Sequence, residues 1–289
     1  ANSGGVENVY LELPKVDLSR IIVPNKDIHT RCTETWNEYL EVVKENGGDL
    51  YNTLETFAYT DEEYAKFKRS ANKEVNYLVK EFECRKSADS YARATTSRTG
   101  VLDTSKLHTY RYNEDLFKKV TTLADGKNHG LVFVLDWSGS MGDVILDTVK
   151  QLYNLIWFCK KVNIPFEVYA FTCEYPVLRP AGNDGYLISA YEKKDGLVQI
   201  PEYFSMMNLL TSKVKAKELD EQMRNIFRIA RFFGSYVSSK VIPMGMGLSG
   251  TPLNEAIVCL HEIIPQFKKE NKLQKVQCVI LTDGEAPPV

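Results

Sequence analysis

The chain has 289 residues, of which 44% are hydrophobic and 26% charged, and its formal net charge is -2. This composition is typical of a globular protein with a substantial core, and the balanced charge gives no reason to expect a nucleic-acid or membrane-surface partner. No apolar stretch reaches the roughly 18 to 20 residues that a membrane span needs, and the first residues lack the features of a signal peptide. We therefore expect a cytoplasmic protein.

The cysteines point to the same compartment. They are widely spaced, form no C-x-x-C pair, and several lie inside apolar runs: Cys32, Cys84, Cys159, Cys173, Cys259 and Cys278. We expect reduced, buried thiols rather than a disulfide framework or a zinc site.

The N-terminal region reads as mainly helical. LSRIIVP, residues 18–24, resembles a short extended piece, and residues 32–48 form an amphipathic pattern that stops at two glycines. From Asp61, apolar residues recur at three- and four-residue steps, which predicts a long helix over about 61–96. Thr60 and Glu63 fit a capping box at its start. Residues 97–117 then link this helix to the next region.

From about residue 130 the pattern changes to alternating strands and helices. The predicted strands are 130–136, 165–172 and 275–282, and the predicted helices are 143–163, 215–234 and 251–271. Alternation of this kind predicts a central parallel sheet with helices on both faces. We expect a helical region over 1–128 and an α/β domain over 129–289. Because the chain lacks a starting Met and stops just after a strand and turn, we expect a fragment whose α/β domain is incomplete at its C-terminal end.

Three polar clusters fall at predicted strand or helix ends. Asp136-Trp137-Ser138-Gly139-Ser140 follows the first strand, Gly250-Thr251-Pro252-Leu253 precedes a helix, and Thr282-Asp283-Gly284 follows the last strand. Ligand sites of open parallel sheets lie at the carboxyl ends of the strands. We therefore expect the three clusters to meet in one crevice.

The residue types in these clusters favour a metal ion. Asp136, Ser138 and Ser140 alternate, so one turn can direct all three side chains at one point. Hydroxyls and a few carboxylates are hard oxygen ligands that suit Mg²⁺, with Mn²⁺ close behind, whereas Ca²⁺ usually takes more carboxylate and carbonyl oxygens. Such a shell is incomplete, and a carboxylate from a partner protein can fill the open position.

The pattern D-x-S-x-S, a later G-T-P-L and a strand-ending T-D-G resemble the metal-ion-dependent adhesion site (MIDAS) of von Willebrand factor type A (VWA) domains. The resemblance implies a VWA, Rossmann-like fold. It implies that Ser138 and Ser140 coordinate the ion directly and that Thr251 contributes its hydroxyl. It also implies that Asp136 and Asp283 act directly or through water.

A narrower resemblance covers VNYLVKEFECRKSADSYARA, TGVLDTSKLHTYRYNEDLFKKV and GLVFVLDWSGSMGDV, which are similar to the CobT-like proteins of tailed bacteriophages and bacteria. It implies a non-catalytic subunit of a cobaltochelatase-like complex of cobalamin biosynthesis. The implied partners are a MoxR- or CobS-like AAA+ ATPase and a large corrin-binding subunit, in the host cytoplasm if a phage encodes the chain. Because the long acidic segment of the bacterial subunit is absent, a related remodelling complex stays open.

Other interpretations remain beside this one. Residues 136–140 can be a polar turn that caps the next helix, and the chain can be a stand-alone VWA binding protein. A hydrolase that uses Ser138 and Ser140 is disfavoured, because no G-x-S-x-G frame is present and the four histidines are scattered.

Two residues near the clusters are candidate partner-binding residues. Trp137 either packs beside the site or acts as an exposed docking anchor, and Glu285 reads as a solvated or partner-facing charge. The glycines in PMGMGLSGTP lack a following G-K-[ST], so the sequence predicts no nucleotide-binding loop and any ATP use belongs to a partner.

Overall fold

A five-stranded sheet in the order β1-β6-β5-β4-β7 forms the centre of the computed structural model. The structure describes residues 10–47, 50–92, 95–112, 116–122, 128–174, 194–201, 203–234 and 241–284. The sheet strands are β1 (Ile22–Val23), β4 (His129–Asp136), β5 (Phe166–Thr172), β6 (Ser205–Thr211) and β7 (Lys275–Leu281). The helices are α1 (Leu18–Ile21), α2 (Asn25–Glu45), α3 (Leu50–Ala92), α4 (Ile145–Lys161), α5 (Ala216–Phe233) and α6 (Leu253–Glu270).

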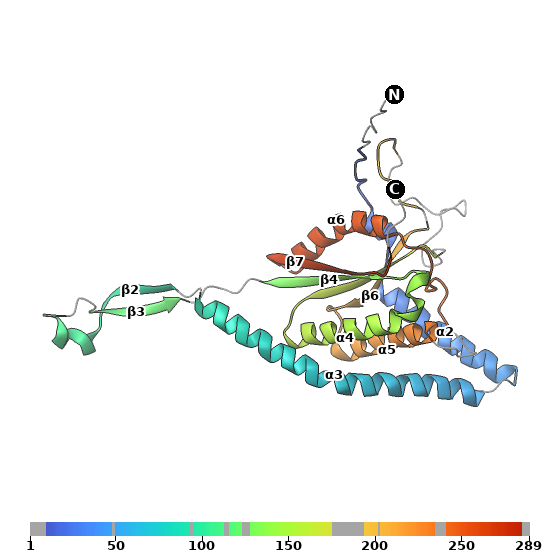
Figure 1. The fold of residues 1–289 in the computed structure, drawn as a ribbon, viewed down its shortest axis with the longest axis horizontal. Helices are drawn as coiled ribbons and strands as arrows, with labels where there is room; N and C mark the ends of the chain where they lie inside the picture. Colours follow the sequence, from blue (N-terminus) through green and yellow to red (C-terminus); the bar gives the residue numbers. More distant parts are fainter. Residues whose placement is uncertain are drawn as a thin grey trace, which may run out of the picture.

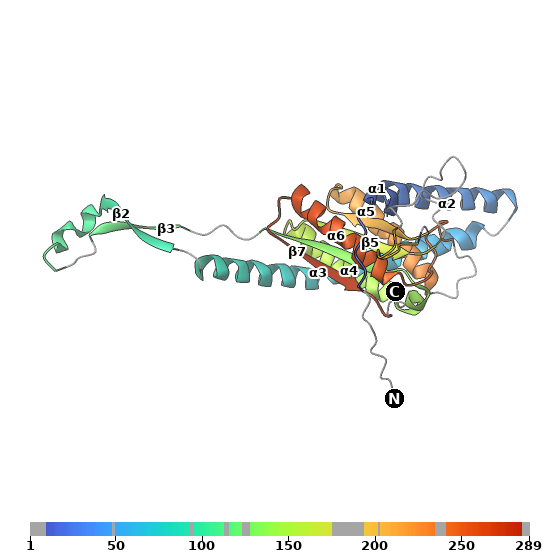
Figure 2. The same cartoon turned by 90° about the horizontal axis from the view of Figure 1, so that it is seen from above.

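Helices cover both faces of this sheet, as Figures 1 and 2 show. The pattern follows from the alternation of side chains along buried strands. In β4, Phe133 and Leu135 join the core under α2, α3, α4 and α5, whereas Val132 and Val134 join the core under α6. The predicted α/β architecture with a helix-flanked central sheet is confirmed, and it is compatible with a Rossmann-like fold.

The predicted all-parallel sheet is wrong in one place. β4 runs parallel to β5 and β7, and β1 runs parallel to β6, but β5 and β6 are antiparallel. Antiparallel neighbours need no crossover helix, and the sequence between them carries no helical pattern. The sheet is therefore mixed, and the edge strand β1 comes from the N-terminal region.

The long helix α3 also differs from its prediction. It spans 43 residues, so it begins at Leu50 rather than Asp61 and ends at Ala92 rather than near Thr96. Thr60 therefore lies within the helix and not at its start. The acidic residues that suggested a helix start instead form ion pairs with α5: Arg228 Nε lies 2.7 Å from Asp61 Oδ1, and Arg231 Nε lies 2.9 Å from Glu63 Oε2.

Aromatic contacts hold α3 against the body of the protein. The rings of Phe67 and Trp157 lie 5.5 Å apart, and those of Phe82 and Phe158 lie 5.4 Å apart. Beyond these contacts α3 leads to the antiparallel strands β2 (Thr95–Leu102) and β3 (Phe117–Thr122), with the 3-10 helix η1 (Thr104–Thr109) between them. Both views place this hairpin away from the sheet (Figures 1 and 2). The sequence had predicted only a link there.

The cysteines are free, as predicted, but only three of the six are buried. All six thiols are free; Cys32, Cys159 and Cys259 are buried, Cys173 is half-buried, and Cys84 and Cys278 are exposed. Burial raises the pKa of Cys32 and of Cys159 to about 12, so these two thiols are unreactive core residues.

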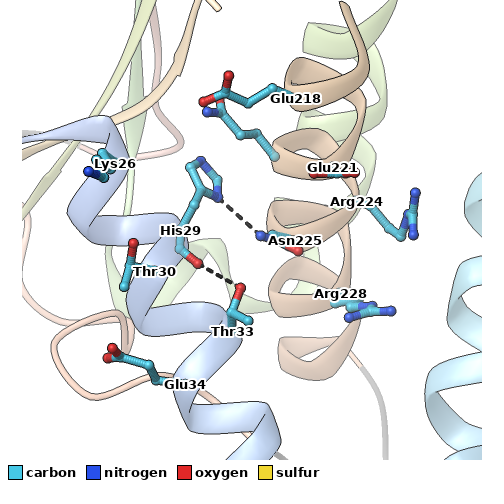
Figure 3. A pocket seen from close by; sticks show the side chains of 11 residues that line it. Lys26, His29, Thr30, Thr33, Glu34, Glu218, Glu221, Arg224, Asn225 and Arg228 are labelled. Atoms are coloured by element: carbon cyan, nitrogen blue, oxygen red, sulfur yellow. Dashed lines mark hydrogen bonds between the residues drawn. The ribbon is translucent and has the colours of Figure 1, made fainter. Parts of the chain in front are cut away.

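A polar groove of about 470 Å³ separates α2 from α5 (Figure 3), and the buried side chain of His29 lies in its wall. His29 Nε2 donates to the Leu209 carbonyl over 2.8 Å, which leaves Nδ1 to accept from Asn225 Nδ2 at 3.3 Å. The neutral ring is thus bonded at both nitrogens. Burial, only partly offset by the Leu209 bond, lowers the pKa of His29 to about 4.

This environment predicts acid sensitivity. The unfolded His29 ring takes up a proton near pH 6.5 and the folded ring near pH 4, so its contribution to stability is complete above pH 6.5 and is lost as the pH falls toward 4. At pH 4.5 the loss amounts to about 3 kcal/mol. Urea unfolding at pH 7 and pH 4.5 measures it. His29→Gln keeps a donor and an acceptor without titrating, so it should show a smaller pH dependence than the wild type; equal dependence in both proteins would contradict the assignment.

Candidate functional site

Asp136, the last residue of β4, joins two loops at the carboxyl end of the sheet. Its side chain is fully buried. Oδ1 accepts from the backbone N–H of Ser138 at 2.9 Å, and Oδ2 accepts from the Thr282 hydroxyl at 2.6 Å. Because β4 and β7 are parallel neighbours, their carboxyl ends meet, and this carboxylate connects the loops that follow them.

The hydroxyls beyond Asp136 form a chain that ends on the second predicted carboxylate. The hydroxyl oxygens of Ser138 and Ser140 lie 3.0 Å apart, and the Ser140 hydroxyl donates to Asp283 Oδ1 over 2.9 Å. Ser138 is buried, whereas Ser140 and Asp283 are exposed. Four of the five predicted metal ligands are therefore in one cluster, with its open side toward solvent.

The fifth residue, Thr251, lies on a segment that the structure places beside Ser138. Ser138 and Ser249 form a parallel bridge, in which Gly139 N donates to Ser249 O over 2.7 Å and Ser249 N donates to Trp137 O over 3.1 Å. Thr251 follows two residues later and is half-buried. Across the described parts of the chain, its hydroxyl makes no hydrogen bond to the four clustered side chains.

The spacing of these oxygens is that of ordinary hydrogen bonds, and it is also compatible with a small divalent cation. Adjacent ligands of an octahedral ion with bonds of 2.0–2.1 Å lie about 2.9 Å apart, and the successive oxygens of Ser138, Ser140 and Asp283 are 3.0 and 2.9 Å apart. No group of three or more His, Cys, Asp or Glu side chains in the described ranges is placed to hold a metal. An ion at this cluster would therefore depend on the hydroxyls as well as on the two carboxylates.

The same neighbourhood offers no base for serine hydrolysis. His129 begins β4, at the opposite end of the strand from Asp136, and His29, which lies on α2, is hydrogen-bonded to the Leu209 carbonyl of β6. All four histidines lie in described residues, and none hydrogen-bonds to Ser138 or Ser140. A serine nucleophile without a neighbouring base stays weak, so this geometry gives the hydrolase no support.

Of the two predicted partner-binding residues, the structure describes only Trp137. Trp137 is fully buried, its Nε1 donates to the Met246 carbonyl at 2.8 Å, and its ring packs edge-on against Phe233. It packs beside the site, and the alternative role as an exposed docking anchor is wrong. Glu285 lies outside the described residues.

Two residues for which the sequence predicted no role hold the cluster together. Thr282 orients Asp136, and Ser249 connects the loop of Thr251 to the loop after β4. Thr282 belongs to the third predicted cluster, but its hydrogen bond to Asp136 was not expected. Nothing in the local sequence marks Ser249, whose contacts are all far away along the chain.

Two wider observations bear on function. Among the helices formed by described residues, none has the length and apolar character needed to cross a membrane. Comparison with protein-family models, curated proteins and solved structures returns no match.

Proposed function

We propose that this chain is a VWA-like module that binds Mg²⁺ or Mn²⁺ in a MIDAS-type site and uses the ion to hold a carboxylate of another protein. The observation that carries the proposal is the chain of oxygens from Ser138 through Ser140 to Asp283, with spacings of 3.0 and 2.9 Å at the carboxyl end of the sheet. A polar turn that only caps the next helix would not need the second carboxylate, which comes from the loop after β7.

Each of the predicted ligands would have a distinct role in holding the ion. The Ser138 and Ser140 hydroxyls bind the ion directly, and Thr251 adds a hydroxyl from its neighbouring loop. Asp283 neutralises charge from the exposed side, directly or through water. Asp136 is held by Ser138 N and Thr282, so it fixes the two loops and supplies the buried negative charge. The ion, when bound, acts as a Lewis acid that attracts an anionic group.

The partner would approach from the side of Ser140 and Asp283, which are exposed. We propose a MoxR- or CobS-like AAA+ ATPase as that partner, in a chelatase-like or remodelling complex that can include a large corrin-binding subunit. The resemblance to CobT-like proteins supports this part of the proposal. In this arrangement the chain couples subunits and catalyses no reaction itself.

A titration with Mn²⁺ tests the ion site. Loss of a residue outside the direct ligand shell commonly weakens metal affinity about 10- to 100-fold, so Ser140→Ala and Asp283→Asn should each weaken it by about 100-fold or more. Both positions are exposed, so neither change should unfold the protein. Asp147→Asn is the matched control, because its side chain is 81% exposed on α4. Wild-type protein that takes up no Mn²⁺, or variants with wild-type affinity, would refute the site.

The ATPase partnership needs its own test. The expected result is that the ATPase co-purifies with the chain in Mg²⁺ and is lost in EDTA or with Asp283→Asn. Capture that persists under both conditions would argue against ion-dependent binding. Reconstituted cobalt insertion that runs equally well without the chain would rule out the chelatase role while leaving the ion site standing.

A further inference from the structure

A separate group of hydrogen bonds ties the loop of Thr251 to the carboxyl end of β5. The Ser249 hydroxyl oxygen accepts from the backbone N–H of Cys173 at 3.0 Å and lies 3.1 Å from the Thr172 hydroxyl oxygen. Thr172 is the last residue of β5 and is buried. Neither Thr172 nor Ser249 belongs to the predicted ligand set.

Glu174 extends this connection one step along the loop. Its Oε2 accepts from the backbone N–H of Gly247, and its own N–H donates to the Thr172 hydroxyl oxygen over 3.1 Å. A Cβ at position 247 would lie 2.6 Å from Glu174 Oε1, so any larger residue there would push the Glu174 carboxylate away from its present position. Partial burial raises the pKa of Glu174, and the Gly247 hydrogen bond opposes that rise.

Ser249 is therefore a junction between two strand ends. Its backbone pairs with Trp137 and Gly139 after β4, and its side chain pairs with Thr172 and Cys173 after β5. Thr251 is two residues farther along and makes no side-chain bond of its own to the cluster in the described residues. The hydrogen bonds of Ser249 are thus one restraint on the Thr251 segment, beside the hydrogen bond from Leu253 N to the Thr251 carbonyl at the start of α6, which is 2.9 Å long.

We infer that Ser249, anchored by Thr172, is a positioning residue that sets the Thr251 hydroxyl for the ion. This inference rests on the proposed ion site. Residues that orient metal ligands commonly change affinity about 10- to 100-fold when removed. Ser249→Ala removes only the side-chain hydrogen bonds to Thr172 and Cys173. The backbone pairing with Trp137 and Gly139 remains, because it does not need the hydroxyl. It should therefore weaken Mn²⁺ binding by about 10-fold and leave the sheet intact.

A double-mutant cycle on the full chain tests this inference, with the Mn²⁺ dissociation constant and the metal-free melting temperature measured for each protein. If Ser249 acts through Thr251, then Ser249→Ala has little further effect once Thr251 is already Ala. Ser249→Thr keeps the hydroxyl and should restore affinity to within about 3-fold of the wild type. Ser70→Ala, an exposed serine on α3, is the control.

The outcomes separate the two proposals. Wild-type protein that binds no Mn²⁺ refutes the ion site and this inference with it. Wild-type binding together with an unchanged dissociation constant in Ser249→Ala refutes the inference alone, even if the melting temperature falls. Additive losses in the double variant also refute it, because Ser249 would then act independently of Thr251.

Discussion

Replacing Trp137 with Ala is expected to lower the free energy of unfolding by about 3–5 kcal/mol, the range for large aromatic side chains removed from a core. The Trp137 side chain is fully buried directly after Asp136, and its Nε1 donates to the Met246 carbonyl over 2.8 Å. The variant loses the apolar contacts of the ring, leaves a cavity beside Phe233, and leaves that carbonyl without its indole donor. Urea unfolding of the metal-free protein measures the change.

The variant Trp137→Phe separates the contribution of the apolar ring contacts from that of the hydrogen bond to Met246. Phe keeps most of the ring volume and loses the hydrogen bond, so its loss should be clearly smaller than that of the Ala variant. A docking anchor on the surface would behave differently, because its removal would weaken partner binding and leave the unfolding free energy within about 0.5 kcal/mol of the wild type. That result would overturn the buried placement of Trp137.

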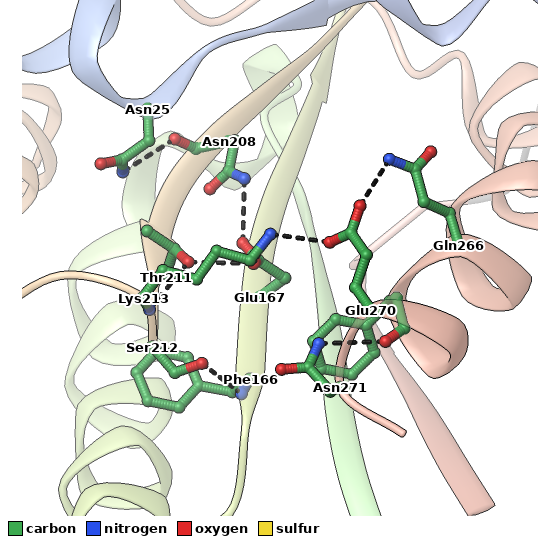
Figure 4. Close-up of polar contacts among 11 residues, drawn as sticks. Asn25, Phe166, Glu167, Asn208, Thr211, Ser212, Lys213, Gln266, Glu270 and Asn271 are labelled. Atoms are coloured by element: carbon green, nitrogen blue, oxygen red, sulfur yellow. Dashed lines mark hydrogen bonds and ion pairs between the residues drawn. The ribbon is translucent and has the colours of Figure 1, made fainter. Parts of the chain in front are cut away.

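Replacing Glu167 with Ala is expected to destabilise the fold by about 2–4 kcal/mol. Glu167 lies in β5 and is only 2% exposed. Its carboxylate accepts from Asn208 Nδ2 and from the Thr211 hydroxyl, both at 2.9 Å, and lies 3.4 Å from Lys213 Nζ (Figure 4). Removing the acceptor strips buried donors of their partner, which is the costly way to break a polar network.

Lys213 limits the loss of stability expected for Glu167→Ala. It is half-exposed and keeps a second carboxylate, Glu270, at 2.9 Å, so the ammonium is not left buried and unpaired. Glu167→Gln retains an acceptor and nearly the same volume, and we expect it to lose about 1 kcal/mol. Urea unfolding of both variants and of the wild type measures the difference. Equal losses for Gln and Ala would show that the hydrogen bonds of Glu167 contribute little.

The sequence predicted best the elements with the strongest periodicity. The boundaries of α4, α5 and α6 lie within two residues of the prediction, and β4, β5 and β7 lie within one, because long amphipathic patterns and apolar runs with clear ends define them. β6 was missed. Its SMMNLLT follows a region without regular pattern, and only its pairing with β5 shows that the chain reverses direction there.

The start of α3 shows why a capping signal can mislead. Thr60 and Glu63 have the spacing of a capping box, but threonine and acidic residues also occur inside helices. Asp61 and Glu63 are explained by Arg228 and Arg231 on α5, which are more than 160 residues away in sequence. Side chains that form tertiary ion pairs can therefore have the same spacing as a helix-capping motif.

The candidate site was predictable to the extent that it depends on strand ends. Asp136, Ser138, Ser140 and Asp283 follow two parallel neighbours, so the strand-end rule brings them together. The contribution of Ser249 and Thr172 was not predictable, because it depends on contacts between loops 76 or more residues apart. The predicted ligands can be read from the local sequence, whereas the residues proposed to hold them in place can be found only from the fold.

We propose that Ser138, Ser140 and Thr251 converge on one divalent cation. Anomalous diffraction from crystals of the chain grown with Mn²⁺ can locate that ion. We expect one strong peak within bonding distance of the Ser138 and Ser140 hydroxyls, with Thr251 turned toward it, and no peak there in Asp283→Asn crystals prepared in the same way. A wild-type crystal with Mn²⁺ bound elsewhere, or with Ser140 still hydrogen-bonded to Asp283 and no ion between them, would contradict it.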